Sequence, residues 1–532
     1  MCNHSSKGDH FCIMPPSPEL LEKIVKTKAA LLREADLADF NDVDILDLRT
    51  FSQITSRPHK TRNHDFVGEA REQAPVLGNK RAIVLLVDFS DKTAAQPQAH
   101  FNNLLFSVGS YATGSMRDFY REASYGQLDV TGAVAGQGGP TAGWFRAPQT
   151  KAFYTNNDFG FGAYPRNAQK LAEDAIDLAN PFVSFSQYDN DGDGFVEALV
   201  IICAGIGGEQ SGNKNDIWSH KWGIAPKNVD GVKIDRYFMA PENGKVGVMA
   251  HELGHLLCGL PDLYDTDYTS QGTGRWDLMA GGSWGNGGDK PAHPTAWCKV
   301  TTGWVNPTVI FGAEQEVTIR PYESNKDVIK LPVGSINSKE YFLLSNRRKE
   351  GFDVSLPGEG LLIEHIDENQ SGNTDENHYL VDVEQADGLR QLNLNPQTNS
   401  SANSGDATDV FPTAANNSFT ASSTPSSKAY NGTDSKISIT NIARSGNNIT
   451  AKINVGGVAA LTTLSNKKVL QVFCSPHTTN AWAFIESAGW RKVSELSADG
   501  VTNMYAALVK ARITNQTVTV QVDGSKIHLL YY

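Results

Sequence analysis

The clearest apolar run of the chain is RAIVLLVDFS at residues 81–90, where leucine and β-branched residues follow one another between polar ends. A continuous run of this length predicts a strand that is buried on both faces. Upstream, residues 17–34 carry leucines and isoleucines at roughly helical spacing behind Pro15 and Pro16, which predicts a helix capped by Ser17. Because charged, turn-rich sequence separates the two segments, we place a domain boundary near residue 78.

Beyond that boundary, helix-like and strand-like segments alternate. They lie at residues 114–123, 128–134, 166–178 and 197–203. This order indicates a domain built on a central sheet. From about residue 306 the runs become short, with Gly, Asn and Asp between them. We therefore predict an α+β fold, with a mixed domain over residues 79–306 and a β-rich, sandwich-like domain over residues 307–455.

The end of the chain carries a third pattern. Residues 392–435 are rich in Asn, Ser and Thr and predict long loops, and residues 456–463 have the composition of a linker. The runs VLQVF, NMYAALV, VTVQV and HLLYY then predict a small β module over residues 464–532. Trp482 and Trp490 could stack on a glycan or another surface, but the pattern favours packing in the core of the module. The partner of this module is left open.

Charge and hydropathy narrow the classes of partner. With 47 Lys and Arg against 59 Asp and Glu, the net charge is −12, and no basic block occurs. This disfavours nucleic acid and anionic membranes as main partners. The longest apolar runs, at residues 82–87 and 198–202, fall far below the ~18 residues of a membrane helix. The N-terminus lacks the apolar stretch of ~7–15 residues that a secretory signal needs. We therefore expect no nucleic-acid partner and no membrane span, and we see no signal peptide.

A metal-binding pattern stands at residues 249–265, MAHELGHLLCGLPDLYD. On a helix, His251 and His255 lie one turn apart on one face, where they can hold one ion. Neutral imidazole is a standard ligand of Zn²⁺, and a catalytic zinc keeps one position open for water. Glu252 is rotated by about 100° from His251 and suits a general base that takes the proton of that water. The alternative is a surface helix that carries two histidines by chance.

The third zinc ligand is expected directly after this helix. Gly259 and Pro261 end the helix and turn the chain back, so Asp262 comes within reach of the same ion. Asp265 is the alternative, although we expect it rather to accept a hydrogen bond from a ligating histidine. Downstream, the sequence WDLMAGG predicts a tight turn whose methionine, Met279, packs beneath the metal site.

A second metal site is predicted at Asp189-x-Asp191-x-Asp193-Gly194. Carboxylates at positions 1, 3 and 5 and glycine at position 6 match the first half of a Ca²⁺-binding loop. Position 12 is not the glutamate of that loop, and Glu197 can close the coordination shell instead. The alternative is a solvated acidic turn.

The six cysteines contain no CxxC pair and are too few for a disulfide scaffold. Cys12 stands just before the predicted N-terminal helix, and its thiolate could take the open zinc position and keep the protein inactive. The alternatives, a disulfide between Cys2 and Cys12 or an idle thiol, are favoured. Cys258 and Cys298 can form a disulfide if their helices pack together. We expect the other two cysteines to be buried thiols.

Several segments together resemble the immune inhibitor A family of metallopeptidases. The resemblance extends over about residues 80–455 and rests on VLLVDFSD, SMRDFYREASYGQLDVTG, YDNDGDGFVEALV, DIWSHKW, HELGH with GLPDLYD, WDLMAGGSWG, HPTAWCKVTTGWV, GLLIEHID and YLVDVEQADG. It implies a metzincin-like zinc protease fold with a Met-turn, and secretion from the cell. It also implies a pro-segment over residues 1–78, because MPPSPELL is similar to the pro-segments of these enzymes.

The chain departs from the family's HExxHxxGxxD pattern at one point. Cys258 stands where the family has glycine, Gly259 follows it, and Asp262 comes seven rather than six residues after His255. An extra residue inside a helix would rotate the residues after it by about 100°, whereas at a helix end a looser last turn can absorb it. The two histidines are unaffected, and the identity of the third ligand depends on this turn.

Motifs and resemblance lead to one expected function. The chain is predicted to be a zinc-dependent endopeptidase that hydrolyses protein or peptide substrates with a metal-activated water and with Glu252 as general base. The alternative is a catalytically silent binding or adhesion protein on the same fold. Loss of Glu252 or of either histidine would indicate that alternative, and all three are present.

Overall fold

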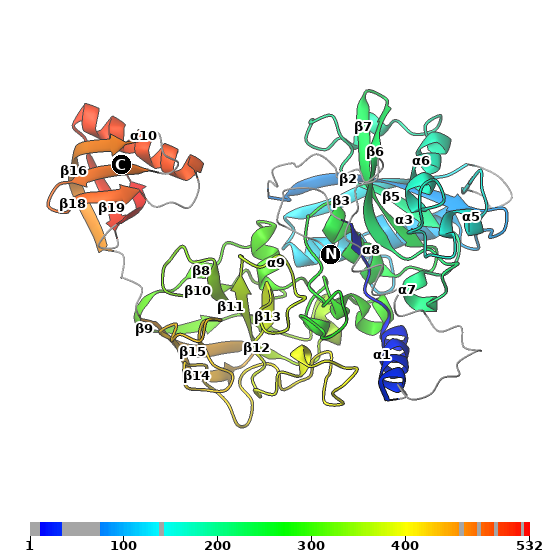
Figure 1. Ribbon diagram of the computed structural model, residues 1–532. Coiled ribbons are helices and arrows are strands. Elements are labelled where there is room, and N and C mark those ends of the chain that lie inside the picture. Colours follow the sequence, from blue (N-terminus) through cyan, green and yellow to red (C-terminus); the bar gives the residue numbers. More distant parts are fainter. Residues whose placement is uncertain are drawn as a thin grey trace.

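The computed structural model describes residues 11–33, 75–137, 143–456, 462–475, 480–493, 498–522 and 526–531. Within these ranges the chain forms an α+β structure, as the sequence predicts (Figure 1). Among the helices of the described ranges, none is long and apolar enough to cross a membrane.

A seven-stranded sheet forms the first part of the structure. Its strand order is β1-β6-β7-β5-β2-β3, and β4 also pairs with β2. The strands β2, β3, β5 and β7 run parallel, whereas β6 is antiparallel to β7 and β1 is antiparallel to β6. The predicted buried strand is β2, in which every residue from 82 to 88 is buried. The strands are β1 (Cys12–Ile13), β2 (Gly78–Asp88), β3 (Leu128–Ala135), β4 (Phe145–Arg146), β5 (Leu199–Cys203), β6 (His220–Val229) and β7 (Val232–Pro241).

Helix α8 (Val246–Leu256) follows β7 directly and carries the predicted metal motif. All of its residues are buried, including His251, Glu252 and His255. Helix α4 (Met116–Ala123) starts with a capping box between Ser115 and Asp118. The Tyr120 hydroxyl donates a hydrogen bond to the Ala250 carbonyl at 2.6 Å. This bond ties α4 to α8.

The other helices of this part lie along the chain between the strands. The α-helices are α1 (Pro18–Arg33), α3 (Gln98–Phe106), α5 (Lys151–Thr155), α6 (Ala168–Ala179), α7 (Gly208–Ser211) and α9 (Ala296–Thr301). The short 3₁₀ helices are η1 (Phe185–Tyr188), η2 (Gly274–Trp276) and η3 (Gly281–Gly288).

Two smaller sheets form the second part, as the change of pattern near residue 306 predicts. One has the order β13-β12-β11-β10-β8 and the other β14-β15-β9. Apolar side chains from both sheets, such as Phe342 and Ile363 from the first and Ile439 and Ile453 from the second, belong to one buried cluster. The elements are β8 (Thr308–Val309), β9 (Gly312–Ile319), β10 (Ile329–Pro332), β11 (Glu340–Arg347), η4 (Gly351–Ser355), β12 (Gly360–Asp367), β13 (Val381–Val383), η5 (Gln391–Asn393), β14 (Ile437–Ser445) and β15 (Asn448–Val455).

The last part is a closed barrel with the order β16-β17-β18-β20-β19, and it has a core cluster of its own. The prediction that NMYAALV is a strand is wrong, because this run lies inside helix α10. Val501, Leu508 and Ala511 are buried there, and their spacing of seven and three residues is helical. The elements are β16 (Thr462–Cys474), β17 (Ala481–Ile485), β18 (Gly489–Val493), α10 (Ala498–Thr514), β19 (Thr517–Val522) and β20 (Lys526–Tyr531).

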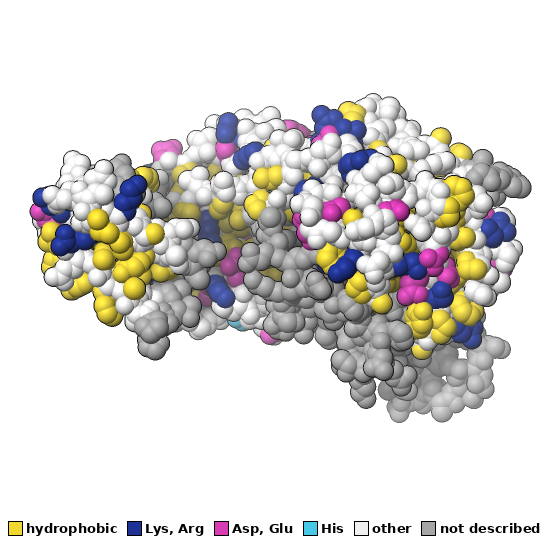
Figure 2. Space-filling model, turned by 90° about the horizontal axis from the view of Figure 1, so that it is seen from above, with side chains coloured by type: hydrophobic (Ala, Val, Ile, Leu, Met, Phe, Trp, Pro, Cys, Tyr) yellow, Lys and Arg dark blue, Asp and Glu magenta, His cyan; other side chains and the backbone are white. Residues whose placement is uncertain are grey.

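The outside of this barrel carries aromatic side chains. Trp490 is 41% exposed, so its predicted place in the core is wrong. Its ring meets that of Phe484 edge-on at 5.6 Å between centroids, on the neighbouring strand. Figure 2 shows hydrophobic side chains together with Lys and Arg on one face of this part.

Candidate metal centre and active site

Helix α8 holds the two predicted histidine ligands so that their rings face one point. The Nε2 atoms of His251 and His255 lie 3.0 Å apart. The Nδ1 atom of His251 lies 2.9 Å from the Leu278 carbonyl oxygen, and that of His255 lies 2.6 Å from the Leu260 carbonyl oxygen. A carbonyl oxygen only accepts, so each Nδ1 carries a proton and each Nε2 keeps its lone pair for an ion.

Asp262 lies where the third ligand is predicted. Its Oδ1 atom is 3.3 Å from His251 Nε2 and 3.1 Å from His255 Nε2. Burial alone would raise the pKa of Asp262, but the two histidines outweigh that effect and hold the pKa below its usual value. The carboxylate is therefore ionised, and it brings one negative charge to the two imidazoles.

The turn after α8 explains how Asp262 reaches this position. Gly259 has φ +61°. Its N–H donates to the His255 carbonyl at 3.2 Å, and the Leu260 N–H donates to the Gly254 carbonyl at 3.1 Å. The bond from the N–H of this left-handed glycine to the carbonyl four residues back is an αL motif, which closes a helix and reverses the chain.

The donor set fits a zinc ion. Two imidazole nitrogens and one carboxylate oxygen converge, and such sets hold catalytic zinc while leaving a position open. Glu252, fully buried on the same helix, has no hydrogen bond of regular geometry to either carboxylate oxygen among the described residues. A buried carboxylate of this kind is costly unless an ion or a bound water satisfies it.

Several neighbours shift the pKa of the Glu252 carboxylate. Burial raises its pKa well above the usual value, and the charges of Asp262 and Glu209 raise it further. Lys221 and the backbone N–H of Met14 lower its pKa. Glu252 thus lies between the predicted metal ligands and the N-terminal segment.

Met279 packs against the helix that carries the predicted metal motif. A Cβ atom added at Gly254 would lie 2.9 Å from Met279 Sδ, so the methionine fills the space that this glycine leaves between the two histidines. The Met279 carbonyl accepts the N–H of Leu263 at 2.9 Å. Since the preceding carbonyl, that of Leu278, orients His251, this turn supports both the helix and a ligand.

Asp265 does not support a histidine, and that expectation is wrong. Both Nδ1 atoms are already bonded to backbone carbonyls. The Asp265 carboxylate accepts instead from the hydroxyls of Ser270 at 2.8 Å and Thr269 at 3.1 Å. Burial, and then the charge of Asp267, raises the pKa of Asp265 to about 7. It groups with Asp267 and Glu376, away from the zinc ligands.

The N-terminal segment lies between α8 and the sheet edge at β6 (Figure 1), and we call this region the cleft. Strand β1 pairs with β6 so that Cys12 faces Lys221 and Ile13 faces His220. The Met14 N–H continues this ladder with a 3.0 Å bond to the Ser219 carbonyl. Every residue from 12 to 17 is buried.

Three aromatic side chains hold this segment by its backbone, and sequence reasoning missed all three. Trp218 Nε1 donates to the Met14 carbonyl at 2.7 Å, and Trp284 Nε1 donates to the Pro15 carbonyl at 3.0 Å. The Tyr264 hydroxyl donates to the Ile13 carbonyl at 2.9 Å. The only signal was their place inside the family-like motifs DIWSHKW, WDLMAGGSWG and GLPDLYD.

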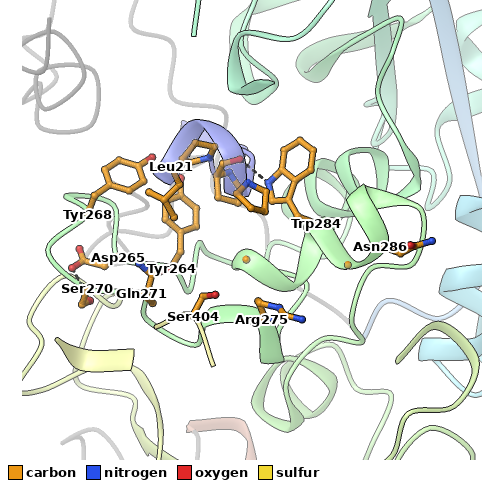
Figure 3. A pocket seen from close by; sticks show the side chains of 15 residues that line it. Leu21, Tyr264, Asp265, Tyr268, Ser270, Gln271, Arg275, Trp284, Asn286 and Ser404 are labelled. Carbon is orange, nitrogen blue, oxygen red and sulfur yellow. Dashed lines mark hydrogen bonds between the residues drawn. The ribbon is translucent and has the colours of Figure 1, made fainter. Parts of the chain in front are cut away.

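A cavity of about 280 Å³ adjoins these contacts. Figure 3 shows Leu21 of the N-terminal segment next to Tyr264, with Tyr268 to the left and Trp284 to the right. Arg275 also lines it. The cavity is therefore bounded partly by the N-terminal segment and partly by the loops that follow α8.

Cys12 lies beside two of the predicted zinc ligands. Its Sγ atom, a His255 ring nitrogen and an Asp262 oxygen all lie within 4.8 Å of one another. However, Cys12 is disulfide-bonded, so the idle-thiol alternative is wrong, and in this oxidised form Cys12 offers no thiolate. Cys2, the partner considered from the sequence, lies outside the described residues.

The other cysteines partly contradict the sequence predictions. Cys258 and Cys298 are both buried but form no disulfide, and burial raises the pKa of the Cys258 thiol to about 12. Cys203 is buried, as predicted, whereas Cys474 is exposed.

The predicted calcium loop brings its four carboxylates together. Asp189, Asp191, Asp193 and Glu197 each offer an oxygen, and these oxygens lie within 4.8 Å of one another. The loop is held by two hydrogen bonds to the Asp189 carboxylate, which accepts the backbone N–H of Gly192 at 2.7 Å and that of Gly194 at 3.0 Å. The Glu197 Oε1 atom is buried and has no hydrogen-bond partner within the described ranges.

Comparison with known proteins agrees with this geometry. Residues 72–309 match the family model described as immune inhibitor A peptidase M6, catalytic domain. Pre-pro-metalloprotease PrtV of Vibrio cholerae serotype O1 is 29% identical over 367 residues, which cover 55% of this chain and 37% of that protein. Immune inhibitor A of Bacillus thuringiensis subsp. alesti is 32% identical over 260 residues, which cover 38% of this chain and 36% of that protein.

The matched regions thus span little more than a third of the length of these curated relatives. Within that span lie the HExxH helix, the turn to Asp262 and the Met279 turn. Residues 72–309 of this chain are therefore similar to the catalytic domain of the immune inhibitor A family of M6 peptidases.

Proposed function

We propose that this chain is a zinc-dependent endopeptidase that hydrolyses peptide bonds of protein substrates. The observation that carries the proposal is the convergence of His251, His255 and Asp262 beside the buried carboxylate of Glu252. The metalloprotease names of the relatives support it. We propose a metzincin-like catalytic domain over residues 79–306, followed by a β-rich domain over residues 307–455 and a C-terminal module over residues 464–532.

The reaction assigns a role to each group. Zinc, when bound by the two histidines and Asp262, would polarise the substrate carbonyl and would lower the pKa of a water molecule bound to the metal. Glu252 accepts a proton from water as the water oxygen bonds to the carbonyl carbon. It then gives that proton to the leaving nitrogen as the C–N bond breaks, so the products are an amine and a carboxylic acid, which ionises at neutral pH. The buried position of Glu252 on the ligand helix suits this transfer.

Peptide substrates are expected to add to the edge of the sheet. Apart from β1, strand β6 has β7 as its only partner in the sheet order of the described residues. The edge therefore offers main-chain donors and acceptors to an extended peptide. Strand β1 shows that an antiparallel chain fits beside α8. Recognition through the main chain suits a protease, because it accepts many side-chain sequences.

The N-terminal segment is proposed to act as a pro-region over residues 1–78. Residues 12–17 fill the cleft that a substrate would need, and three aromatic donors hold their carbonyls. In a reduced form, Cys12 would also bring a thiolate next to His255 and Asp262, and thiolate binds zinc strongly. This arrangement supports latency until the segment leaves.

Two further parts of the proposal rest on fewer observations. We propose Ca²⁺ at Asp189, Asp191, Asp193 and Glu197, supported by their converging oxygens and by the partnerless Glu197 Oε1. We also propose that the protein is secreted, as the relatives' names suggest for proteases of this kind. A silent binding protein is the weaker reading, because no metal or acid/base residue of the site is replaced.

The test is metal analysis combined with proteolysis. The purified full chain, nicked with trypsin to release the N-terminal segment, should hold about one zinc per molecule and should digest casein. A chelator such as 1,10-phenanthroline should abolish the digestion, and zinc should restore it. Stoichiometric zinc without any chelator-sensitive digestion would favour the binding protein, and absence of zinc would refute the metal site.

A further inference from the structure

The Tyr264 hydroxyl contacts the N-terminal segment and also interacts with the neighbouring Tyr268. Tyr264 follows Asp262 by two residues and is 5% exposed. Its hydroxyl donates to the Ile13 carbonyl oxygen at 2.9 Å. A phenol so placed, at the turn that supplies a metal ligand, presents a hydrogen-bond donor to whatever main chain occupies the cleft.

The peptide bond between Ile13 and Met14 lies between two groups of the site. Its carbonyl oxygen accepts a hydrogen bond from the Tyr264 hydroxyl. Its N–H donates to the Ser219 carbonyl and lowers the pKa of the Glu252 carboxylate. These contacts involve only backbone atoms of the segment. A substrate that pairs with β6 in the same register would therefore place one of its own peptide bonds between the same two side chains.

We propose that Tyr264 is a catalytic residue whose hydroxyl donates a hydrogen bond to the carbonyl oxygen of the bond being cleaved. The inference rests on the proposed endopeptidase function. It adds a donor for the charge that grows on that oxygen when water attacks. The hydroxyl keeps its proton throughout, so the proton balance of the reaction is unchanged.

The energetic reason is that a hydrogen bond to a charged oxygen is about twice as strong as one to a neutral carbonyl. A donor that is already in place in a buried site pays little to reorganise, and removing one such donor costs roughly 10²–10³ in kcat. Tyr268 helps to fix the ring, because it stacks on Tyr264 with centroids 6.0 Å apart and an interplanar angle of 26°. Tyr268 is thus a positioning residue.

The test compares Tyr264→Phe with two matched variants in the trypsin-nicked full chain. Tyr264→Phe should lower kcat on a fluorogenic peptide by about 10²-fold and leave KM and zinc content unchanged. Trp284→Phe removes a donor to a carbonyl two residues further along and should raise KM instead. Tyr164→Phe removes a hydroxyl bonded to Glu173 on the surface and should change neither constant.

A transition-state analogue provides a readout other than turnover. A phosphinic peptide carries a negative oxygen at the position of the reacting carbonyl, so Tyr264→Phe should raise its Ki by about the factor lost in kcat. A kcat within threefold of the parent, a loss seen only in KM, or an unchanged Ki would each overturn the assignment of Tyr264. A parent chain without zinc or peptidase activity would refute the proposed function itself, which is a separate result.

If Tyr264→Phe unfolds or loses zinc, fluorinated tyrosines at position 264 replace it. They keep the ring and the hydroxyl but make the phenol a stronger donor, so kcat at neutral pH should rise with phenol acidity while KM stays constant. A flat response would overturn the proposal.

Discussion

The identity of the third zinc ligand can be tested by removing Asp262 and Asp265 separately. Asp262 Oδ1 lies 3.1 and 3.3 Å from the two ligating nitrogens, and it brings the only negative charge of the donor set. Asp265 bonds to Ser270 and Thr269 and reaches neither histidine. We therefore expect Asp262→Ala to release zinc and Asp265→Ala to retain it.

The contacts of each carboxylate set the expected magnitude. Removing a partner that only supports a ligand costs roughly 10–100-fold in metal affinity. Loss of a ligand should exceed the upper end, so the zinc Kd of Asp262→Ala should rise by at least about 100-fold, or about 2.8 kcal/mol. Asp265→Ala should change the Kd by less than about threefold, because its hydrogen bonds end on hydroxyls that do not touch the metal ligands.

The assay is competition for zinc against a chromophoric chelator of known affinity, with zinc content after dialysis as a second measure. Asp262→Asn and Asp265→Asn serve as shape-matched controls, since they keep the volume and remove the charge. Circular dichroism of the metal-free proteins checks that each variant is folded. Full retention of zinc in Asp262→Ala, together with loss in Asp265→Ala, would refute the reasoning.

Four other outcomes are expected. Glu252→Gln should keep zinc and lose at least about 100-fold in kcat, and a rate within tenfold of the parent would show that Glu252 is not the base. Removal of residues 1–74, which keeps the bond between Trp304 and the Val76 carbonyl, should raise peptidase activity of well-folded protein; an unchanged rate would count against latency. Ca²⁺ at about 1 mM should raise the Tm of the parent but not of Asp191→Ala, and equal shifts would exclude this loop as the site. Burial raises the pKa of Glu364 to about 7, so between about pH 4.5 and pH 7 the folded state holds a proton that the unfolded chain releases. The free energy of unfolding should therefore fall as the pH rises through this range. Urea titrations at several pH values should show that Glu364→Gln loses this part of the pH dependence.

Local patterns were enough to predict the central strand and the shared helical face of His251 and His255. The run at residues 81–90 is buried because it forms the centre of the sheet, and a continuous apolar run records that environment directly. The four-residue spacing of His251 and His255 fixes a shared helical face. Such signals depend on neighbours in the sequence, so one sequence is enough to find them.

The contacts that close the cleft could not be predicted in this way. Trp218 and Met14 are 204 residues apart, and Tyr264 and Ile13 are 251 apart. The bonds go to backbone carbonyls, which every residue carries, so no side-chain pattern in the segment signals them. Helix α10 was missed for the opposite reason, because a short apolar run such as NMYAALV fits both a strand and a buried helix.

The departure from the family pattern illustrates how local chemistry can preserve a site. The family has HxxGxxD, and here one residue is added before the glycine, so the distance from Gly259 to Asp262 keeps its three residues. Gly259 takes the left-handed position that ends the helix, and the following carbonyl, that of Leu260, accepts the His255 Nδ1 proton. The added residue therefore extends the end of the helix, while the turn that orients His255 and delivers Asp262 keeps its length. An insertion between Gly259 and Asp262 would instead change that turn, and would separate the carboxylate from the two histidines.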